Sequence, residues 1–263
     1  EGGGASSISY SGKSTPAPIE SPSDVNAFFD AAEGNDLAAG FADDLAPAST
    51  KRIGKYSVKA TQSVDETVSG ACGGTMRVYG SGQDTAPYYM DLTISANNYC
   101  ESNSIINGSL NLTGDENNFT MRFNVIEVKD SYRTVDAAMD GSISFTYESN
   151  LSTMVTNIVA EDRNAGFQVK FENYTVQVDE SDFNYPTSIS GRIYQSTDGY
   201  VDISTIDPIV EGFSGNPESG KLKIVGDGQT AYIEFDAISY VIFIDENDNA
   251  TWDSGEQTQT YTY

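Results

Sequence analysis

The residues with the clearest chemistry form one acidic stretch late in the chain, from Asp245 to Glu256. Calcium takes about six to eight oxygen ligands, and a twelve-residue loop supplies them from its positions 1, 3, 5, 7, 9 and 12. Here those positions hold Asp245, Asn247, Asn249, Thr251, Asp253 and Glu256. The pattern predicts a Ca²⁺ site to which Thr251 contributes its backbone carbonyl and Glu256 a bidentate carboxylate.

Two features set this stretch apart from a helix–loop–helix calcium site. Position 6 holds Ala250, where glycine normally makes the sharp turn, so a lower affinity is expected. The stretch follows a strand-like segment, 240–244, instead of a helix. The alternative interpretation is an acidic hairpin turn in which Asn and Asp serve as ordinary turn residues. A calcium ion here is expected to be structural and to clamp two late strands together.

The chain as a whole is strongly acidic. Its 263 residues carry 14 Lys and Arg against 39 Asp and Glu, a net charge of −25, and they include no histidine. Nucleic acid is excluded as a natural partner, because phosphate contacts require Lys and Arg. The lack of histidine removes the commonest general base and the imidazole metal ligand. Carboxylate chemistry remains, but no spacing selects a catalytic pair, so we expect no enzymatic activity.

The two cysteines, Cys72 and Cys100, predict a disulfide. It would close a loop of roughly 28 residues and stabilise the fold by about 3 kcal/mol. The alternative is two unpaired buried thiols. No run of about 18 apolar residues occurs, so no membrane span is expected. The Gly-rich start lacks a basic-then-apolar leader and is typical of a processed exported protein, so we expect a secreted or bacterial cell-surface location.

The N-terminal part is expected to differ from the rest. Residues 1–22 form a predicted flexible leash that carries a short alternating strand and three prolines. Residues 23–52 form a predicted helical cap. Within the cap, Ser23 is the expected N-cap, 25–32 the expected helix, and the Ala-rich stretch 37–45 a further turn or two.

From residue 53 to 263 the apolar pattern has a period of two, which is typical of half-buried strands. Turn residues recur at intervals of roughly 10 to 15 residues, which leaves no room for crossover helices. The predicted fold class is all-β: an antiparallel sandwich or jelly-roll-like meander that can divide into two packed sub-domains. Strands are expected at 75–79, 88–94, 109–112, 119–128, 142–147, 167–178, 189–194, 201–206, 221–225, 231–235 and 240–244. Residues 258–263 form a closing edge strand or, alternatively, a second docking strand.

Two local patterns predict irregularities in these strands. Apolar residues up to Phe171 share one face, whereas those from Tyr174 onward fall on the other. This change predicts a β-bulge at Glu172 and Asn173, the alternative being two strands joined by a tight bend. Four short repeats of the form polar–Gly–polar–apolar predict glycines with positive φ at strand starts: Gly108, Gly141, Gly191 and Gly220.

Short motifs occur along most of the chain: Ala71-Cys72-Gly73-Gly74, Asn98-Tyr99-Cys100, Ile106-Asn107-Gly108-Ser109, Thr15-Pro16-Ala17-Pro18-Ile19 and Ser219-Gly220-Lys221-Leu222 before the acidic loop. Together they resemble a group of exported bacterial β-rich surface proteins that are often classed as lipoproteins. The resemblance implies export and a β fold. It brings no catalytic residues.

The opening strand is the feature that points to a function. Its residues are set apart from the domain by glycines and prolines: Ala5, Ser6, Ser7, Ile8, Ser9 and Tyr10. A tethered strand can complete the open sheet edge of a neighbouring copy through main-chain hydrogen bonds. The sequence thus predicts a structural protein, a filament or pilus-like subunit whose partners are copies of itself. In the alternatives the segment pairs with its own domain, or it is the spacer of a monomeric carbohydrate-binding or adhesive lipoprotein.

Carbohydrate is relevant in two further ways. Glycosylation sequons begin at Asn107, Asn111, Asn118, Asn150, Asn173 and Asn249, although an Asn- and Thr-rich chain also makes such motifs by chance. The 16 tyrosines suit sugar stacking, but most alternate within predicted strands and are expected in the core or in cross-strand pairs. Trp252 lies inside the acidic loop and is expected to cover it.

Overall fold

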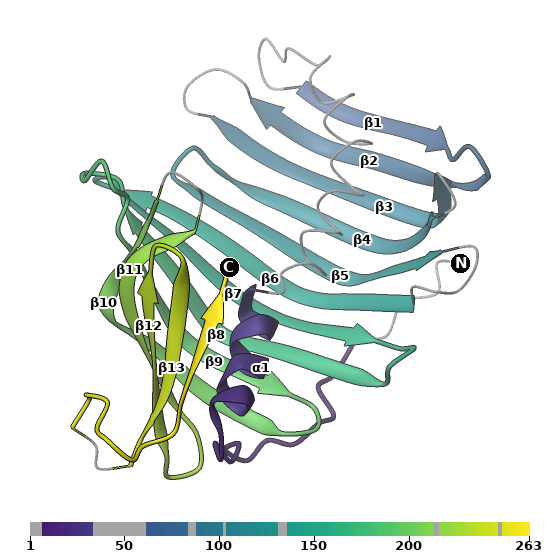
Figure 1. The fold of residues 1–263 in the computed structure, drawn as a ribbon. Helices are drawn as coiled ribbons and strands as arrows, with labels where there is room; N and C mark the ends of the chain where they lie inside the picture. The colour runs from purple at the N-terminus through teal and green to yellow at the C-terminus, as the bar shows by residue number, and fades with distance from the viewer. Residues whose placement is uncertain are drawn as a thin grey trace. The chain divides into compact units, whose positions relative to one another are not determined.

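The computed structural model describes residues 7–33, 62–83, 88–101, 104–130, 136–212, 216–246 and 249–263. This part of the chain contains one helix and fourteen antiparallel strands (Figure 1). The helix α1 spans Pro22–Glu33. The strands are β1 Gln62–Ser69, β2 Gly73–Gln83, β3 Tyr89–Glu101, β4 Ser104–Asp115, β5 Asn118–Asp130, β6 Asp136–Glu148, β7 Leu151–Asp162, β8 Phe167–Asp179, β9 Thr187–Gln195, β10 Gly199–Glu211, β11 Pro217–Val225, β12 Thr230–Asp236, β13 Ser239–Asp245 and β14 Thr258–Thr262.

The hydrogen-bonded order of the strands is their order in the sequence, from β1 to β14. This is meander connectivity, in which each strand pairs with the one before it and the one after it. The all-β antiparallel class, the meander and the short helix near the N-terminus are confirmed. One sheet order connects all fourteen strands, whereas a sandwich divides its strands between two sheets.

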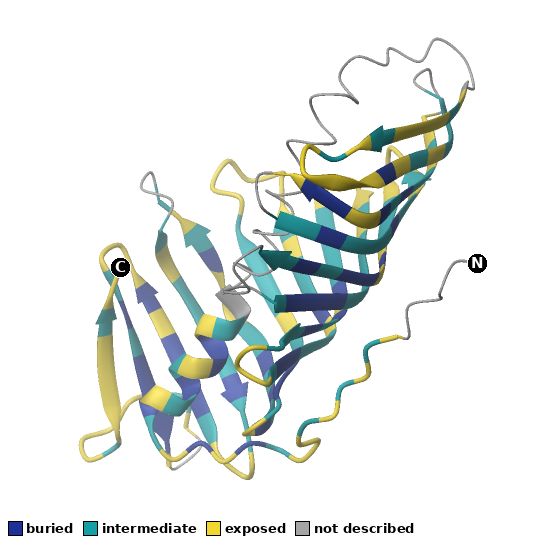
Figure 2. Cartoon of the chain, turned by 90° about the vertical axis from the view of Figure 1, so that its right-hand side faces the viewer, coloured by how far each residue is buried: buried dark blue, intermediate teal, exposed yellow. Residues whose placement is uncertain are grey.

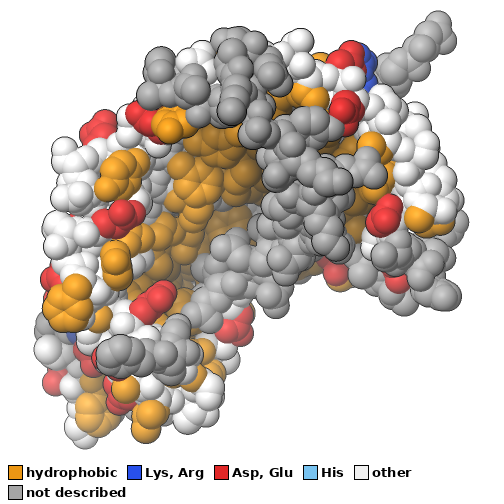
Figure 3. Space-filling model, turned by 90° about the horizontal axis from the view of Figure 1, so that it is seen from above, with side chains coloured by type: hydrophobic (Ala, Val, Ile, Leu, Met, Phe, Trp, Pro, Cys, Tyr) orange, Lys and Arg blue, Asp and Glu red, His pale blue; other side chains and the backbone are white. Residues whose placement is uncertain are grey.

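The chain folds as two compact units. Unit 1 comprises Glu1–Tyr10, Gly34–Thr146 and Ile158–Gln168, and unit 2 comprises Ser11–Glu33, Tyr147–Asn157 and Val169–Tyr263. The acidic side chains visible in Figure 3 are scattered singly and do not form one patch.

The core of unit 1 lies on one face of its strands. Ile94 of β3 pairs with Leu110 of β4, which in turn pairs with Phe123 of β5, and all three side chains are buried. This alternation is what the period-two pattern predicts. The whole cluster comprises Met76, Ile94, Ala96, Tyr99, Ile106, Leu110, Phe123, Ile126, Val128, Ala137, Met139, Ile158 and Ala160.

The core of unit 2 forms between α1 and one face of the sheet. Val25, Phe28 and Phe29 of the helix are buried. The Phe29 ring lies 5.8 Å from that of Phe235 and 5.4 Å from that of Tyr240. Buried residues run along the strands of this unit, as Figure 2 shows in dark blue. Burial of this apolar face is the main source of stability for a 12-residue helix, which is marginal on its own.

The helix begins earlier than the sequence analysis predicted. Its first residue is Pro22, so the N-cap is Ser21 and not Ser23. The Asp24 carboxylate accepts the Ser21 N–H at 2.8 Å and the Glu20 N–H at 3.0 Å, so it makes one of the two bonds of a capping box. Proline is favourable at the first helical position because its missing N–H would have no partner there. The further helical turns expected at 37–45 lie outside the described residues.

The segment that precedes the helix is docked, so the leash is shorter than the predicted 1–22. Ala17 and Ile19 are fully buried. The Ala17 N–H donates to the Tyr200 carbonyl at 2.8 Å, and the Tyr200 N–H donates to the Thr15 carbonyl at 3.0 Å. The Asp227 N–H donates to the Ala17 carbonyl at 2.8 Å. These bonds fix the chain against two turns of unit 2 before α1 starts.

The bulge predicted in β8 is confirmed. Asn173 has a φ of +50°, and the pairing with β9 shifts register between Glu172 and Thr175. Gly191 of β9 lies against this bulge, and a Cβ placed there would lie 2.5 Å from the Tyr174 Cα. Only glycine leaves room for the displaced backbone.

The four repeated glycines have the predicted positive φ but not the predicted position. Their φ values are +108°, +131°, +137° and +134° for Gly108, Gly141, Gly191 and Gly220. They lie inside β4, β6, β9 and β11, where the neighbouring strand shifts register, and not at strand starts. The repeat therefore marks places where a bulge in one strand meets the strand beside it.

Candidate functional site: the terminal hairpin and its acidic loop

The predicted calcium loop connects β13 to β14. Asp245 ends β13, and only 6% of it is exposed. Its Oδ1 accepts the Asn249 N–H at 3.2 Å, and its Oδ2 accepts the Ala250 N–H at 2.8 Å. These are the amides of loop positions 5 and 6, so the Asp245 carboxylate stabilises the turn by accepting hydrogen bonds from it.

The other described loop residues are also joined by hydrogen bonds. The Glu256 carboxylate accepts the N–H groups of Glu246 at 3.1 Å and Asp253 at 2.8 Å. Asn249 Oδ1 accepts the Thr251 N–H at 2.8 Å, and its amide donates to Asp253 Oδ2 at 2.7 Å. The loop is therefore closed by its own polar groups.

A lysine from β11 reaches the same loop. Lys221 Nζ donates to the Ala250 carbonyl and to Glu234 Oε1, both at 2.7 Å. It lies 4.8 Å from the ring centroid of Tyr232 and 5.0 Å from that of Phe243. Its side chain is only 12% exposed, so its charge is weakly screened and offsets part of the acidic charge of the loop.

The backbone conformation of the described loop fits a calcium site, but its acidic side chains are not placed around a common point. Ala250 has a φ of +62°, the left-handed conformation for which position 6 normally uses glycine. Within the described residues, which leave out Asn247 and Asp248, no three acidic side chains lie close enough to hold a metal. The carboxylates of Asp245 and Glu256 accept loop amides instead. Ion binding would need these side chains to turn toward a common point.

The strand that leaves this loop forms one end of the sheet. The Ile244 N–H donates to the Gln257 carbonyl, and the Tyr263 N–H donates to the Ile238 carbonyl. Because backbone groups alternate in an antiparallel pair, residues 257, 259, 261 and 263 bond toward β13. Thr258, Thr260 and Thr262 therefore direct their N–H and C=O groups away from β13. Among the described strands, none pairs with this outer side.

The outer edge of β14 lacks the usual protection of an edge strand. Natural edges carry charges, prolines or bulges that prevent pairing with another chain. Residues 258–263 contain no charge and no proline. Every residue of β14 is exposed except the half-buried Tyr261, whose ring stacks on Tyr240 at 5.1 Å (Figure 2). Threonine and tyrosine also favour strands, so this edge is well suited to accept another strand.

The described part of the predicted donor segment, Ser7 to Tyr10, does not form the expected strand. The Ile8 N–H donates to Asp140 Oδ2 at 3.0 Å. Ala5 and Ser6 lie outside the described residues. In the single chain this segment contacts its own molecule, as the alternative interpretation allowed, but through a side chain and not through a sheet.

The predicted disulfide between Cys72 and Cys100 is confirmed, with a Cα–Cα distance of 5.1 Å. It joins the turn before β2 to the end of β3. This bond is consistent with an oxidising compartment.

The predicted glycosylation sites differ in exposure. Asn118, Asn150, Asn173 and Asn249 are exposed, whereas Asn107 and Asn111 are half-buried. Asn107 Oδ1 accepts the N–H of the bulge residue Asn98 at 2.7 Å, and the Asn111 amide donates to Thr93 at 2.7 Å. Glycosylation of Asn107 or Asn111 would disturb the sheet, so the four exposed residues are the better candidates.

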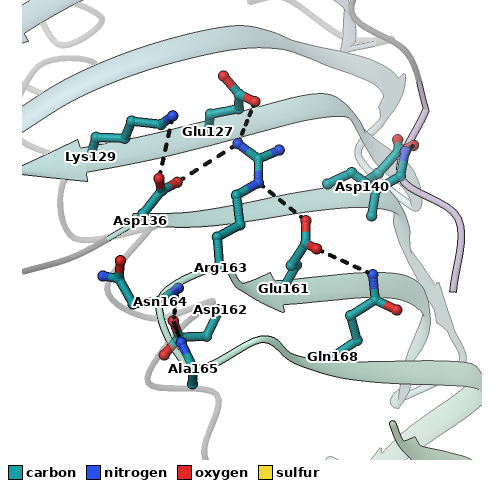
Figure 4. A network of polar contacts seen from close by, with 11 residues as sticks. Glu127, Lys129, Asp136, Asp140, Glu161, Asp162, Arg163, Asn164, Ala165 and Gln168 are labelled. Carbon is teal, nitrogen blue, oxygen red and sulfur yellow. Dashed lines mark hydrogen bonds and ion pairs between the residues drawn. The ribbon is translucent and has the colours of Figure 1, made fainter. Parts of the chain in front are cut away.

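A second cluster of charged groups lies in unit 1 (Figure 4). Arg163 contacts Glu127 at 2.7 Å, Glu161 at 3.2 Å and Asp136 at 3.7 Å, and Lys129 lies 3.4 Å from Asp136. Burial lowers the pKa of Arg163, but its hydrogen bonds to Glu127 and Glu161 outweigh this effect and raise the pKa above its usual value. The cluster ties β5, β6 and the turn after β7 together, and we interpret it as structural.

Comparisons with protein-family models, with curated proteins and with solved structures find no match for this chain. The resemblance to exported β-rich surface proteins therefore stays a prediction. Within the described residues, no helix is long and apolar enough to cross a membrane.

Sequence reasoning missed one part of this site. Lys221 lies 29 residues before the carbonyl it binds, and no local pattern indicates that contact. The edge strand predicted at 258–263 is present as β14.

Proposed function

We propose that this protein is an extracellular structural protein that assembles with copies of itself by β-strand addition, with the edge of β14 as the accepting surface. The observation that carries the proposal is the outward direction of the backbone groups of Thr258, Thr260 and Thr262 on an uncharged strand. The disulfide supports the extracellular location. No catalytic role is proposed.

The energetics of strand addition favour a specific partner over an indiscriminate one. Three threonines offer three N–H and three C=O groups, and each hydrogen bond contributes about 0.5–1.5 kcal/mol. The total of about 3–9 kcal/mol is comparable to the roughly 4–15 kcal/mol lost when two molecules associate. Side-chain packing must therefore decide the affinity. An added strand whose apolar residues alternate can place them beside Tyr261.

We propose that the added strand is the segment from Ala5 to Tyr10 of a neighbouring copy. Ile8 and Tyr10 share one face of an extended chain, and the segment carries no charge. Neutrality matters because each copy has a net charge of −25. The Lys13 N–H donates to the Ser196 carbonyl in unit 2, and twelve residues of chain span up to about 40 Å when extended. Donation costs the bond from the Ile8 N–H to Asp140.

Analytical ultracentrifugation and electron microscopy test this proposal at about 0.15 M salt, where repulsion between copies is screened beyond about 8 Å. The wild type should associate in a concentration-dependent way. Thr260→Pro, which removes an outward N–H, should stay monomeric, whereas Thr260→Val, which keeps that N–H, should associate. Deletion of residues 1–12 should also give monomers. Assembly by Thr260→Pro would contradict β14 as the accepting edge. If the deletion variant assembles and Thr260→Pro does not, residues 5–10 are not the added strand.

A carbohydrate-binding role is the second candidate, and exposed aromatic residues favour it. In unit 2 the side chains of Tyr147, Phe183 and Tyr185 are 40%, 86% and 57% exposed. Tyr147 lies near the end of β6. The Glu180 N–H donates to the Asn150 carbonyl at 2.7 Å, which joins the turn after β6 to the segment that carries the other two. Aromatic faces stack on sugars, so Phe183→Ala should weaken binding on a glycan array, with Ile238→Ala as an exposed apolar control. Equal effects of the two changes would count against the role.

We also propose that the loop from Asp245 to Glu256 binds Ca²⁺ as a structural clamp on the terminal hairpin. Support comes from the left-handed Ala250 and from a suitable oxygen at each ligand position. Calorimetric titration with Ca²⁺ should give heat with the wild type and none with Asp245→Ala. Lys221→Met should increase the affinity, because it removes a competing cation. Identical heats for the wild type and Asp245→Ala would rule the clamp out.

A further inference from the structure

A cavity of about 200 Å³ lies in unit 2 between α1 and the strands β8 to β12. Phe29 of the helix forms one wall, and Ile203, Leu222 and Phe235 of the sheet form others. These four side chains are buried. The lining also includes Thr187 and Glu211, which are the polar groups at its border.

A register shift lies in a strand that lines the cavity. Ser204 of β10 pairs with Ser190 of β9, and Ile209 pairs with Thr187. These two pairs are five residues apart on β10 but only three apart on β9. Thr205 Oγ1 accepts the Ile189 N–H at 2.6 Å and donates to the Ile189 carbonyl at 3.1 Å, in place of main-chain pairing. Bulges of this kind re-aim side chains and are common beside functional sites.

A neighbouring strand shows the same irregularity at the same cavity. Tyr174, which lines the cavity, follows the bulge at Asn173 in β8. Both β8 and β10 therefore have a register shift next to residues that line the cavity. A built cavity of this kind can hold a ligand without a large rearrangement.

The size and lining of the cavity select an apolar group about as large as one aromatic ring. An apolar cavity of about 150 Å³ stays dry and binds benzene, and this cavity is slightly larger. Its border is acidic. No Lys or Arg lines it, and among the described residues the Glu211 side chain has no hydrogen bond or ion pair.

Glu211 is the one charged residue among the described residues of the lining. It is exposed, and the chain has a net charge of −25. A carboxylate ligand is therefore disfavoured at this border, whereas an ammonium group is attracted to it.

We propose that this cavity binds small aromatic amines, with the ring between Phe29 and Leu222 and the ammonium group at Glu211. The proposal is independent of self-assembly, because none of the lining residues belongs to β14 or to the N-terminal segment. 2-Phenylethylamine serves as the probe, and 2-phenylethanol and phenylacetate are the neutral and anionic controls of similar size. Affinity for so small a ligand is on the order of a millimolar Kd.

Isothermal titration and ligand-observed saturation-transfer NMR on the full chain test the proposal. The amine should bind up to about fivefold more tightly than the alcohol, as expected for an exposed charge pair, and phenylacetate should bind most weakly. Glu211→Gln should reduce amine binding to the level of the alcohol, whereas Glu180→Gln, an exposed change elsewhere in unit 2, should not. Equal affinity of the wild type for the amine and for phenylacetate would overturn the proposal.

Filling the cavity provides the second arm of the test. Ile189→Phe places a larger side chain in the cavity and should lower affinity for all the ring-bearing probes by about tenfold or more. Ile206→Phe, at a 49% exposed position of β10 outside the lining, is the matched control. Circular dichroism verifies that both variants fold, and the Glu211→Gln comparison decides the question if Ile189→Phe does not fold. Wild-type affinity in a folded Ile189→Phe, or no amine binding to the wild type, would refute the assignment.

Discussion

Replacing Gly191 with alanine should destabilise the fold far more than an ordinary glycine substitution. The φ of +137° is strained for alanine and costs about 1–3 kcal/mol. The added Cβ would also lie 2.5 Å from the Tyr174 Cα and 2.7 Å from the Asn173 carbonyl oxygen. Because both neighbours are backbone atoms, overpacking adds about 1–3 kcal/mol. We expect a total loss of about 2–6 kcal/mol, a large share of the roughly 5–15 kcal/mol typical of a domain.

Gly228→Ala is the matched control in the same unit. Gly228 has a φ of +71°, but no heavy atom lies within 4 Å of the position that an added Cβ would take, so only a conformational cost of about 1 kcal/mol is expected. Urea unfolding followed by far-UV circular dichroism measures both losses, provided that the slopes of the transitions agree. If the two variants lose the same stability, the close approach of Gly191 to the bulge does not stabilise unit 2 as argued.

Three further changes probe separate features of the molecule. Ala250→Gly should stabilise the fold by about 0.5–1 kcal/mol in urea unfolding, since glycine tolerates a φ of +62° without strain. Cys72→Ser should cost about 3–4 kcal/mol through loss of the disulfide, and a reducing agent should destabilise the wild type but not this variant. Hydrogen bonds from Lys170 and Tyr194 hold the pKa of Glu172 below its ordinary value of 4.5. The stability that these hydrogen bonds give to the folded state is therefore fully present above pH 4.5 and is lost as the pH falls through the lowered pKa of Glu172. Glu172→Gln should reduce the dependence of stability on pH in the acid range.

Much of the β architecture was predictable because it depends on local alternation. The change of parity between Phe171 and Tyr174 is enough to indicate the β8 bulge. The strand β7 was missed because its apolar residues Leu151, Met154, Val155, Ile158 and Val159 are spaced like a helix face. In the structure its buried positions are Thr156, Ile158 and Ala160. Because the buried residue Thr156 is polar, the alternation of apolar residues that would indicate a strand is interrupted there.

Features that depend on distant contacts were not predictable. Pro22 was assigned to the leash, although it starts α1, because prolines occur in both settings. The cavity beneath the helix combines residues from six elements, and its shape depends on where register shifts fall in β8 and β10. The loop after Asp245 was located correctly, but its contact with Lys221 depends on the register of β11 against β12 and β13. Single-chain patterns do not specify that register.

The order of the strands also bears on how the chain folds. Each strand pairs with its predecessor, so the sheet can grow by one hairpin at a time, and local closure of this kind is fast for a β protein. The helix is different. Ala27 and Gln195 are 168 residues apart and Asn26 and Tyr240 are 214 apart, so α1 has no complete docking surface until β13 has formed. Folding of unit 2 should therefore end with a slow step, in which a preformed sheet captures a helix that precedes it in the sequence.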